Sequence, residues 1–208
     1  MILQKEKTMK TALIIVDVQN DFCPGGALPV PHGDEVVTSL NKWIEKAERE
    51  RDYWIVVATR DWHPRETNHF AEFGGRWPVH CVQGTPGARF HPDLQIQQCW
   101  DRQHVPCYIV HKGTHKNEDA YSGFFGTNLA ELFKSRGVTS VYVGGLATDY
   151  CVKATALDAI RLGFKTYLIL DACRAVDVHP GDGDKAVEEM INAGVQIIRT
   201  DEVLGGKE

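Results

Sequence analysis

Residues 144–155, GGLATDYCVKAT, hold the pattern that decides the fold. The four residues before them, 140–143, form a short apolar run typical of a strand. The segment 152–162 carries apolar side chains at helical spacing and is followed by Gly163, a helix stop signal. The sequence therefore predicts a strand, a tight turn and a helix, in that order.

Cys151 lies at the start of this predicted helix. Thr148 and Asp149 are both favourable N-cap residues, which places the thiol near unpaired backbone N–H groups and the positive end of the helix dipole. A thiol in that position ionises more easily. Most single cysteines in soluble proteins are small buried hydrophobic residues, but this position favours a nucleophile. The N–H groups of Ala147 and Cys151 come from the same turn and are candidates for an oxyanion hole.

The composition is that of an ordinary globular protein. The chain has 208 residues, of which 43% are hydrophobic and 25% charged, and a net charge of −5. These values predict one sizeable domain that binds a small molecule and no nucleic acid. No apolar run approaches the roughly 18 residues of a membrane span, and no signal sequence is seen. We therefore expect a soluble cytoplasmic protein with six free thiols, a flexible extension over 1–9 and a single domain over 10–208.

The rest of the chain alternates between predicted strands and helices. Six apolar runs have the length and composition of buried strands: 11–16, 53–59, 108–111, 140–143, 165–170 and 196–199. Four segments have helical periodicity: 34–51 and 127–136, with Asp34 and Thr127 as expected caps, 152–162 and 184–192. This alternation is typical of an α/β fold, with a parallel sheet covered by helices on both faces. The stretch 60–106 has little periodicity, and long irregular segments inside compact domains are usually functional.

Three of the predicted strands lead to a reactive side chain. Asp17 follows the first strand, Lys112 ends the third, and Cys151 lies just beyond the fourth. The carboxyl ends of neighbouring parallel strands meet at one edge of the sheet, the usual place of ligand sites in open α/β sheets. A thiol nucleophile needs a base to take its proton and a positive charge to stabilise the thiolate. Any one of these residues could simply be a polar residue at a solvent-exposed strand end, but the three together predict a catalytic site.

A second cluster of polar residues begins after the second predicted strand. Asp61 and His63 are residues i and i+2 of an extended segment and point the same way, and the return of the chain brings in His80. Two imidazoles and a carboxylate suit Zn²⁺, Fe²⁺ or Mn²⁺ and leave coordination positions open. Histidine pairs are more often structural, but Asp-Trp-His directly after a buried strand favours a metal site. The absence of a CxxC pair argues against a structural zinc knuckle.

Several motifs together resemble the nicotinamidases of the isochorismatase-like cysteine hydrolases. They are DVQNDFCPGGAL (17–28), RDWHP (60–64), WPVHCVQGTPGARFHP (77–92), KG (112–113), YSGFFGT (121–127) and GGLATDYCVKATALDA (144–159). The resemblance covers about residues 10–200 and implies a three-layer αβα fold with a six-stranded parallel sheet. It also implies hydrolysis of nicotinamide to nicotinate and ammonia in NAD salvage, through a thioester on Cys151, with pyrazinamide as a further substrate.

The same resemblance assigns roles to individual residues. It implies a catalytic triad of Asp17, Lys112 and Cys151, an oxyanion hole formed by the N–H groups of Ala147 and Cys151, and a cis peptide bond between Leu146 and Ala147. For the cofactor it implies one divalent metal ion, most simply Zn²⁺, bound by Asp61, His63 and His80, with His69 at the position of a fourth ligand in some members. The residues expected around the substrate are Phe22, Trp77, Tyr121, Leu146 and Tyr150, although core packing explains Phe22 equally well.

Alternative functions also fit parts of the pattern. Tyr150 stands where some relatives carry His, and the loop 114–119, THKNED, differs as well, which affects substrate fit more than the reaction. The chain could instead be an isochorismatase, which would not need the metal cluster, or an amidase for a ureido or carbamoyl group. A metal-dependent binding or scaffold protein without catalysis is the alternative outside enzymes. A homo-oligomer is expected only because family members often form one.

Overall fold

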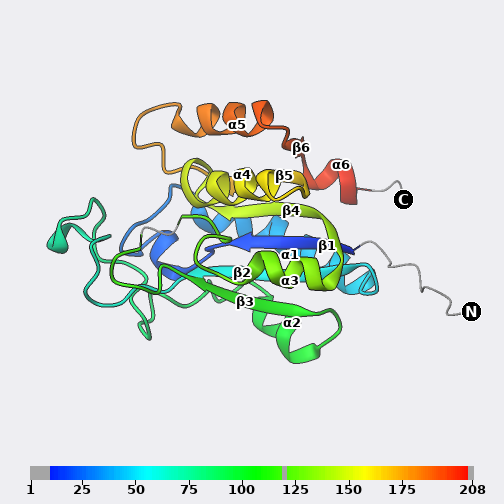
Figure 1. The fold of residues 1–208 in the computed structure, drawn as a ribbon, viewed down its shortest axis with the longest axis horizontal. Coiled ribbons are helices and arrows are strands. Elements are labelled where there is room, and N and C mark those ends of the chain that lie inside the picture. The colour runs from blue at the N-terminus through cyan, green and yellow to red at the C-terminus, as the bar shows by residue number, and fades with distance from the viewer. Residues whose placement is uncertain (1–9, 119–120, 206–208) are drawn as a thin grey trace, which may run out of the picture.

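Six parallel strands form a single sheet in the order β3-β2-β1-β4-β5-β6 (Figure 1). The computed structural model describes residues 10–118 and 121–205, so the expected extension over 1–9 lies outside the described residues. The strands are β1 (Lys10–Val16), β2 (Trp54–Asp61), β3 (Cys107–Lys112), β4 (Val138–Leu146), β5 (Lys165–Arg174) and β6 (Gln196–Ile198). All six predicted strands are present, and the predicted α/β class is confirmed.

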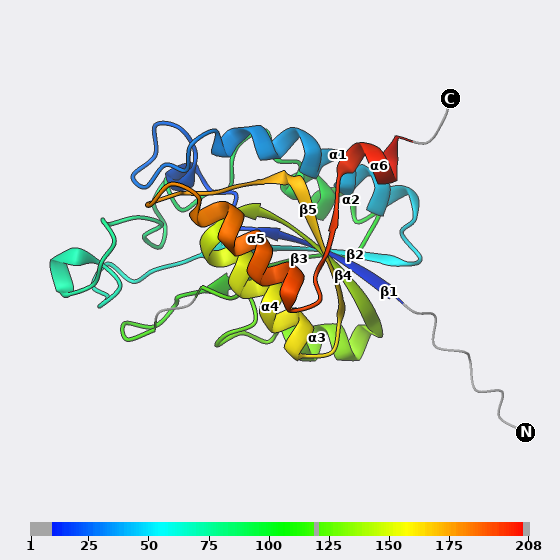
Figure 2. The same ribbon diagram turned by 90° about the horizontal axis from the view of Figure 1, so that it is seen from above.

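Helices cover both faces of the sheet, which gives three layers. Figure 2 shows α1 (Val36–Arg49), α2 (Ile96–Arg102) and α6 (Thr200–Leu204) on one side of the sheet. The opposite side carries α3 (Leu129–Arg136), α4 (Lys153–Arg161) and α5 (Asp182–Asn192). No helix among the described residues is long and apolar enough to cross a membrane.

The central strand β1 contributes to two separate hydrophobic cores. Leu13 and Ile15 point to the layer of α1, where they join a cluster that includes Trp43, while Ile14 and Val16 join the opposite cluster, which includes Phe133. Successive strand residues face opposite sides, so a strand buried on both faces must be apolar throughout. This explains why residues 12–16 are all fully buried.

The helix starts differ from the predicted ones. Asp34 lies in a 3₁₀ turn, Gly33–Glu35, and α1 begins after it without a side-chain cap. Similarly, α3 begins at Leu129 with Asn128 as its N-cap residue, so Thr127 lies one position earlier than expected for the cap. Residues Thr148–Val152 form a π-helical turn before α4, and neither Thr148 nor Asp149 caps it. Asp149 instead accepts hydrogen bonds from the backbone of a loop after β5, which explains why its carboxylate does not turn back on its own helix.

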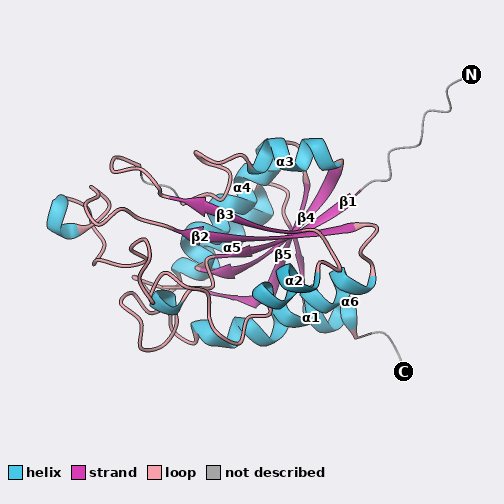
Figure 3. Ribbon diagram, turned by 90° about the horizontal axis from the view of Figure 1, so that it is seen from below, coloured by secondary structure: helices cyan, strands magenta, loops and turns pink. Residues whose placement is uncertain are grey.

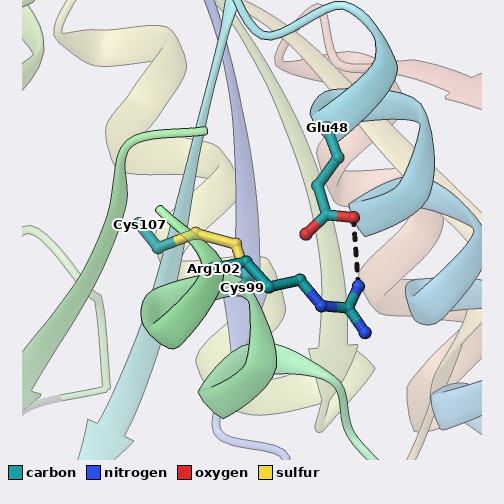
Figure 4. Close-up of a disulfide and its surroundings, with 4 residues drawn as sticks. All are labelled: Glu48, Cys99, Arg102 and Cys107. Carbon is teal, nitrogen blue, oxygen red and sulfur yellow. Dashed lines mark hydrogen bonds and ion pairs between the residues drawn. A yellow bond between two sulfur atoms is a disulfide. The ribbon is translucent and has the colours of Figure 1, made fainter. Parts of the chain in front are cut away.

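The predicted irregular stretch contains a short helix, which a disulfide joins to the strand that follows. Helix α2 lies within it, and Cys99 of this helix is joined to Cys107 at the start of β3 (Figure 4). The expectation of six free thiols is therefore wrong, since four cysteines are free. The spacing of Cys99 and Cys107 in the sequence does not predict this bridge. The two Cα atoms come within 6.4 Å only because the chain reverses direction between α2 and β3.

Removing the disulfide is expected to lower the stability of the fold. The crosslink spans a sequence separation of 8 residues, and closing a loop of this size stabilises a protein by about 2–3 kcal/mol through the unfolded chain. The double variant Cys99→Ser, Cys107→Ser should therefore melt about 5–10 °C below the parent in thermal unfolding.

A matched control is Arg102→Gln. It removes the Arg102–Glu48 ion pair, which also links α2 to α1 at an N–O distance of 3.5 Å (Figure 4), and exposed pairs of this kind contribute less than about 1 kcal/mol. Titration of the unfolded, unreduced chain should find four thiols. Six reactive thiols without reductant would contradict the disulfide.

Candidate active site

The carboxyl end of the sheet brings together an ammonium group, two carboxylates and a thiol. Lys112 Nζ lies 2.7 Å from Asp17 Oδ2 and 3.3 Å from Cys151 Sγ, and it also contacts the carboxylate of Asp61. Asp17 and Lys112 are 0% and 1% exposed, and Cys151 is buried as well. The structure therefore brings together the three residues that the strand ends predicted, and adds Asp61 as a second partner of the lysine.

The order of the strands in the sheet explains why these four side chains lie together. Strands β1, β2 and β3 are neighbours, and β4 lies on the other side of β1. In the register of β2 and β3, Asp61 is opposite Lys112, so both side chains project from the same height of the sheet. Asp17 directly follows β1 with a positive φ of 49°, where the chain turns out of the sheet. Figure 3 shows the long loops gathered at this end of the strands.

Burial and charge set the protonation states of the group. Burial raises the pKa of Asp17 to about 6, against the opposing effect of Lys112. Burial also raises the pKa of the Cys151 thiol well above 9, although Lys112 lowers it. Burial alone would lower the pKa of Lys112, but the neighbouring Asp17 and Asp61 raise it well above its ordinary value. At neutral pH the site holds a carboxylate at Asp17 beside an ammonium ion and a protonated thiol.

This result differs from the expectation that Cys151 ionises easily. The helix dipole was expected to favour the thiolate, but the thiol is buried and desolvation is the largest influence on its pKa. The oxygens of Asp17 and Asp61 and the Cys151 sulfur all lie within 4.8 Å of one another. A base is therefore in place to accept the thiol proton when a bond to sulfur forms.

Thr59 is a member of the site that the sequence did not single out. Its Oγ1 donates a hydrogen bond of 2.8 Å to Asp17 Oδ1, which lowers the pKa of Asp17 against the effect of burial. Thr59 lies in the buried strand β2 and is 0% exposed. A threonine in an apolar strand carries no motif, so only the structure reveals this contact.

Three buried histidines form a cluster beside Asp61. The ring nitrogens of His63, His69 and His80 lie within 4.8 Å of one another. Asp61 Oδ2 is 3.5 Å from His63 Nε2 and 3.9 Å from His80 Nε2. His63 and His80 were predicted as a pair with Asp61, and His69 was given as a further ligand in some relatives. The structure places all three imidazoles in one cluster.

The donor set of this cluster fits a divalent metal ion. Both ring nitrogens of His63 are buried without a hydrogen-bond partner among the described residues, a costly state that a bound cation would relieve. His80 Nδ1 lies 2.7 Å from the carbonyl oxygen of Pro78, which turns Nε2 towards the cluster. Burial lowers the pKa of His80 to about 4, so this ring is neutral and ready to bind a metal at neutral pH.

A cavity opens above the thiol and the imidazoles. The predicted substrate-contacting residues all line it: Phe22, Trp77, Tyr121, Leu146 and Tyr150. Ala147, Cys151, Asp61, His69 and His80 also line it, as do Leu28, Val30 and Val176, which the sequence did not indicate. Leu28 is the last residue of the motif 17–28 but was not singled out, and Val30 and Val176 are apolar loop residues that neither periodicity nor a motif marks.

Aromatic side chains form one wall of this cavity. Trp77 Nε1 donates a hydrogen bond of 2.9 Å to the hydroxyl of Tyr121, and the ring of Trp77 meets Tyr150 edge-on at 5.0 Å. The peptide bond between Leu146 and Ala147 is cis, as the resemblance implied. The wall thus joins the loop that carries His69 and His80 to the turn that carries Cys151.

A buried thiol in contact with an ammonium–carboxylate pair lies at the carboxyl edge of a parallel sheet, beneath a small aromatic cavity. This arrangement is that of an enzyme with a cysteine nucleophile. Comparisons with known proteins identify the group. Residues 11–202 match the isochorismatase domain, so the chain belongs to the isochorismatase family.

Its relatives carry more specific names. The chain is 39% identical over 207 residues to the nicotinamidase of Escherichia coli (strain K12), a match that covers 89% of this chain and 93% of the relative. The crystal structure of pyrazinamidase of Pyrococcus horikoshii in complex with zinc is 46% identical, with a TM-score of 0.81 over 91% of this chain and 99% of that one. The yeast nicotinamidase bound to the inhibitor nicotinaldehyde has a TM-score of 0.81 at 31% identity, over 91% and 99% of the two chains.

Replacement of Gly113 is expected to disturb the imidazole cluster. This glycine has a φ of +63°, and an added Cβ would lie 2.5 Å from His63 Cε1. Gly113→Ala should therefore displace the His63 ring, lower the Tm by several degrees and weaken the binding of Zn²⁺. Thermal unfolding and zinc titration of the metal-free protein measure the two effects.

Gly84→Ala is the matched control. Gly84 also has a positive φ, +79°, but an added Cβ there meets nothing within 4 Å. Both variants pay about 1 kcal/mol for the left-handed backbone, and only Gly113→Ala adds the clash. Equal Tm and equal zinc affinity in the two variants would show that Gly113 does not support His63.

Proposed function

We propose that the protein is a metal-dependent nicotinamidase that hydrolyses nicotinamide to nicotinate and ammonia, and that it also accepts pyrazinamide. The observation that carries this proposal is the contact of Lys112 with both Asp17 and Cys151 directly beneath the aromatic cavity. The names of the relatives support the substrate, since nicotinamide and pyrazinamide are small aromatic carboxamides. The histidine cluster argues against the alternative of an isochorismatase, which does not need it.

In the proposed mechanism Cys151 is the nucleophile and Asp17 the base. Asp17 takes the thiol proton as the sulfur attacks the carboxamide carbon, and Lys112 stabilises the developing negative charge on sulfur. The N–H groups of Ala147 and Cys151 donate hydrogen bonds to the oxyanion. The C–N bond then breaks, and Asp17 gives its proton to the departing ammonia, leaving a thioester.

The second half of the reaction restores the thiol. Asp17, again a carboxylate, takes a proton from a water molecule that attacks the thioester carbon. The C–S bond breaks, the proton returns from Asp17 to the sulfur of Cys151, and nicotinic acid leaves and loses its own proton to solvent to become nicotinate. A pKa of about 6 suits Asp17 to both proton transfers, because the group accepts a proton and returns it near neutral pH.

The metal ion is proposed to be held by Asp61, His63 and His80, with His69 as a further ligand. Zn²⁺ is favoured because neutral imidazoles and a carboxylate suit it, and because a similar pyrazinamidase was solved with zinc. When bound, the ion supplies a Lewis-acid site for the pyridine nitrogen of the substrate. Phe22, Trp77, Tyr121 and Tyr150 enclose the ring, which orients the carboxamide towards the sulfur.

Replacement of the thiol provides the first test of this function. Cys151→Ala should reduce ammonia release from nicotinamide by at least about 1000-fold, while bound zinc and affinity for nicotinamide remain. Cys23→Ala is the control, because Cys23 is also a buried free cysteine but lies outside this cavity, and it should keep normal turnover. Normal ammonia release by Cys151→Ala, or none by the zinc-loaded parent, would refute the proposal.

The pH dependence of turnover is expected to report Asp17. Only its carboxylate form accepts the thiol proton, so kcat/KM for nicotinamide should rise about tenfold per pH unit up to about pH 6 and then level off. Thr59→Val removes a hydrogen bond to that carboxylate and destabilises its charged form. The acid limb of this variant should therefore move to higher pH.

Thr166→Val is the control for this shift. Thr166 is equally buried, but its hydroxyl bonds to the carbonyl of Phe164, outside the site. This variant should keep the acid limb of the parent. An unshifted limb in Thr59→Val would mean that another group controls the acid side of the profile.

A further inference from the structure

Gln19 uses its whole side-chain amide to bind the backbone of distant segments. Its Oε1 accepts a hydrogen bond of 2.8 Å from the N–H of Asp61, and its Nε2 donates to the carbonyl oxygen of Asp61 at 2.9 Å. The same Nε2 donates to the carbonyl oxygen of Ala88 at 3.1 Å. Gln19 is 0% exposed, so these bonds are made away from solvent.

The sheet explains why an amide is needed at this place. In a parallel strand, alternate residues direct both backbone groups to the same neighbour. Thr59 of β2 accepts a hydrogen bond from Asp17 on the β1 side, and Trp62 donates to Lys112 on the β3 side. Asp61, two residues after Thr59, therefore faces the β1 side. There, however, the chain has already left the sheet at Asp17.

The side chain of Gln19 takes the place of the missing strand. A primary amide presents one acceptor and two donor positions, which match the N–H and C=O of one strand residue, as a backbone partner would. Without it, two backbone groups of Asp61 would be left without these partners at the buried end of β2, which is unfavourable. The amide thus extends the β1–β2 pairing by one residue beyond the end of β1.

The backbone of Gln19 also forms hydrogen bonds with neighbouring parts of the site. Its N–H donates to the carbonyl oxygen of Asp17 at 2.8 Å, and the residue forms an isolated antiparallel bridge with Phe90. One residue therefore connects the end of β1, the end of β2 and the loop segment at Ala88 and Phe90. Asp61, at the centre of these contacts, shares its carboxylate between Lys112 and the imidazole cluster.

We propose that Gln19 is a positioning residue for the metal centre, which fixes the peptide of Asp61 so that its carboxylate faces both Lys112 and the histidines. This proposal rests on the proposed function only in taking Asp61 as a metal ligand. Gln19 touches neither substrate nor metal in this role. Its effect reaches the ion through the orientation of Asp61, and partners that orient a ligand typically change metal affinity by about 10–100-fold.

The test measures zinc affinity without substrate. Gln19→Met has a similar length but cannot form the three hydrogen bonds, and its dissociation constant for Zn²⁺ should be at least tenfold weaker than that of the parent. A competing chromophoric chelator, titrated against metal-free protein, gives this constant. Thermal unfolding of the metal-free variants gives the loss of stability separately, since a merely structural role would lower the Tm and leave the dissociation constant unchanged.

Asn20→Ala is the matched control. Asn20 is the next residue, and its Nδ2 donates a hydrogen bond of 2.9 Å to the carbonyl oxygen of Pro86 on the same returning loop, without touching Asp61. Zinc affinity should stay within twofold of the parent. If Gln19→Met does not fold, Gln19→Glu takes its place, with the same expected change of at least tenfold in the dissociation constant for Zn²⁺. The Glu side chain keeps the acceptor for the Asp61 N–H and loses both donors.

Two results would overturn the proposal: zinc binding within twofold of the parent in the Gln19 variant, or equal weakening in Asn20→Ala. Neither result depends on turnover. A parent protein that binds zinc but releases no ammonia from nicotinamide would refute the proposed function and leave the role of Gln19 to be judged from the zinc constants.

Discussion

The buried ammonium ion of Lys112 is the interaction on which the site depends. Two carboxylates, from Asp17 and Asp61, and one thiol lie within 4.8 Å of one another at the end of the sheet. Removing charges from water costs several kcal/mol per ion, and like charges in contact add to that cost. The lysine contacts both carboxylates and the sulfur. It keeps Asp61 ionised beside the imidazoles and limits the pKa of Asp17 to about 6.

The fold satisfies this constraint by placing the charged groups on adjacent strands. Residues from β1, β2 and β3 meet only because these strands are neighbours and in register. Hydrophobic side chains on both faces of the sheet hold the strand ends in place, and Thr59 and Gln19 provide the polar contacts that the charged residues need from their surroundings. The chemistry therefore depends on the hydrophobic cores as much as on the reactive groups.

Sequence patterns predicted the parts of the structure that repeat or that stand at strand ends. Apolar runs marked all six strands, and polar residues at or just beyond the ends of three of these runs led to Asp17, Lys112 and Asp61. The patterns failed where the structure depends on tertiary contacts. Helix α2 buries only Ile96 and Cys99, too few residues for a visible period. Asp149 bonds to a distant loop instead of capping its helix, and the cavity residues Val30 and Val176 lie in loops without a motif.

The two halves of the site are built on different kinds of structure. Cys151, Lys112 and Asp17 stand on or next to strands of the sheet. His69, Trp77 and His80, in contrast, belong to the long connection between β2 and β3. Connections of this kind tolerate insertion and sequence change far better than the strands that they join. Substitutions confined to this one connection can therefore change the aromatic wall and the imidazole cluster, while the thiol, the lysine and Asp17 keep their places on the sheet.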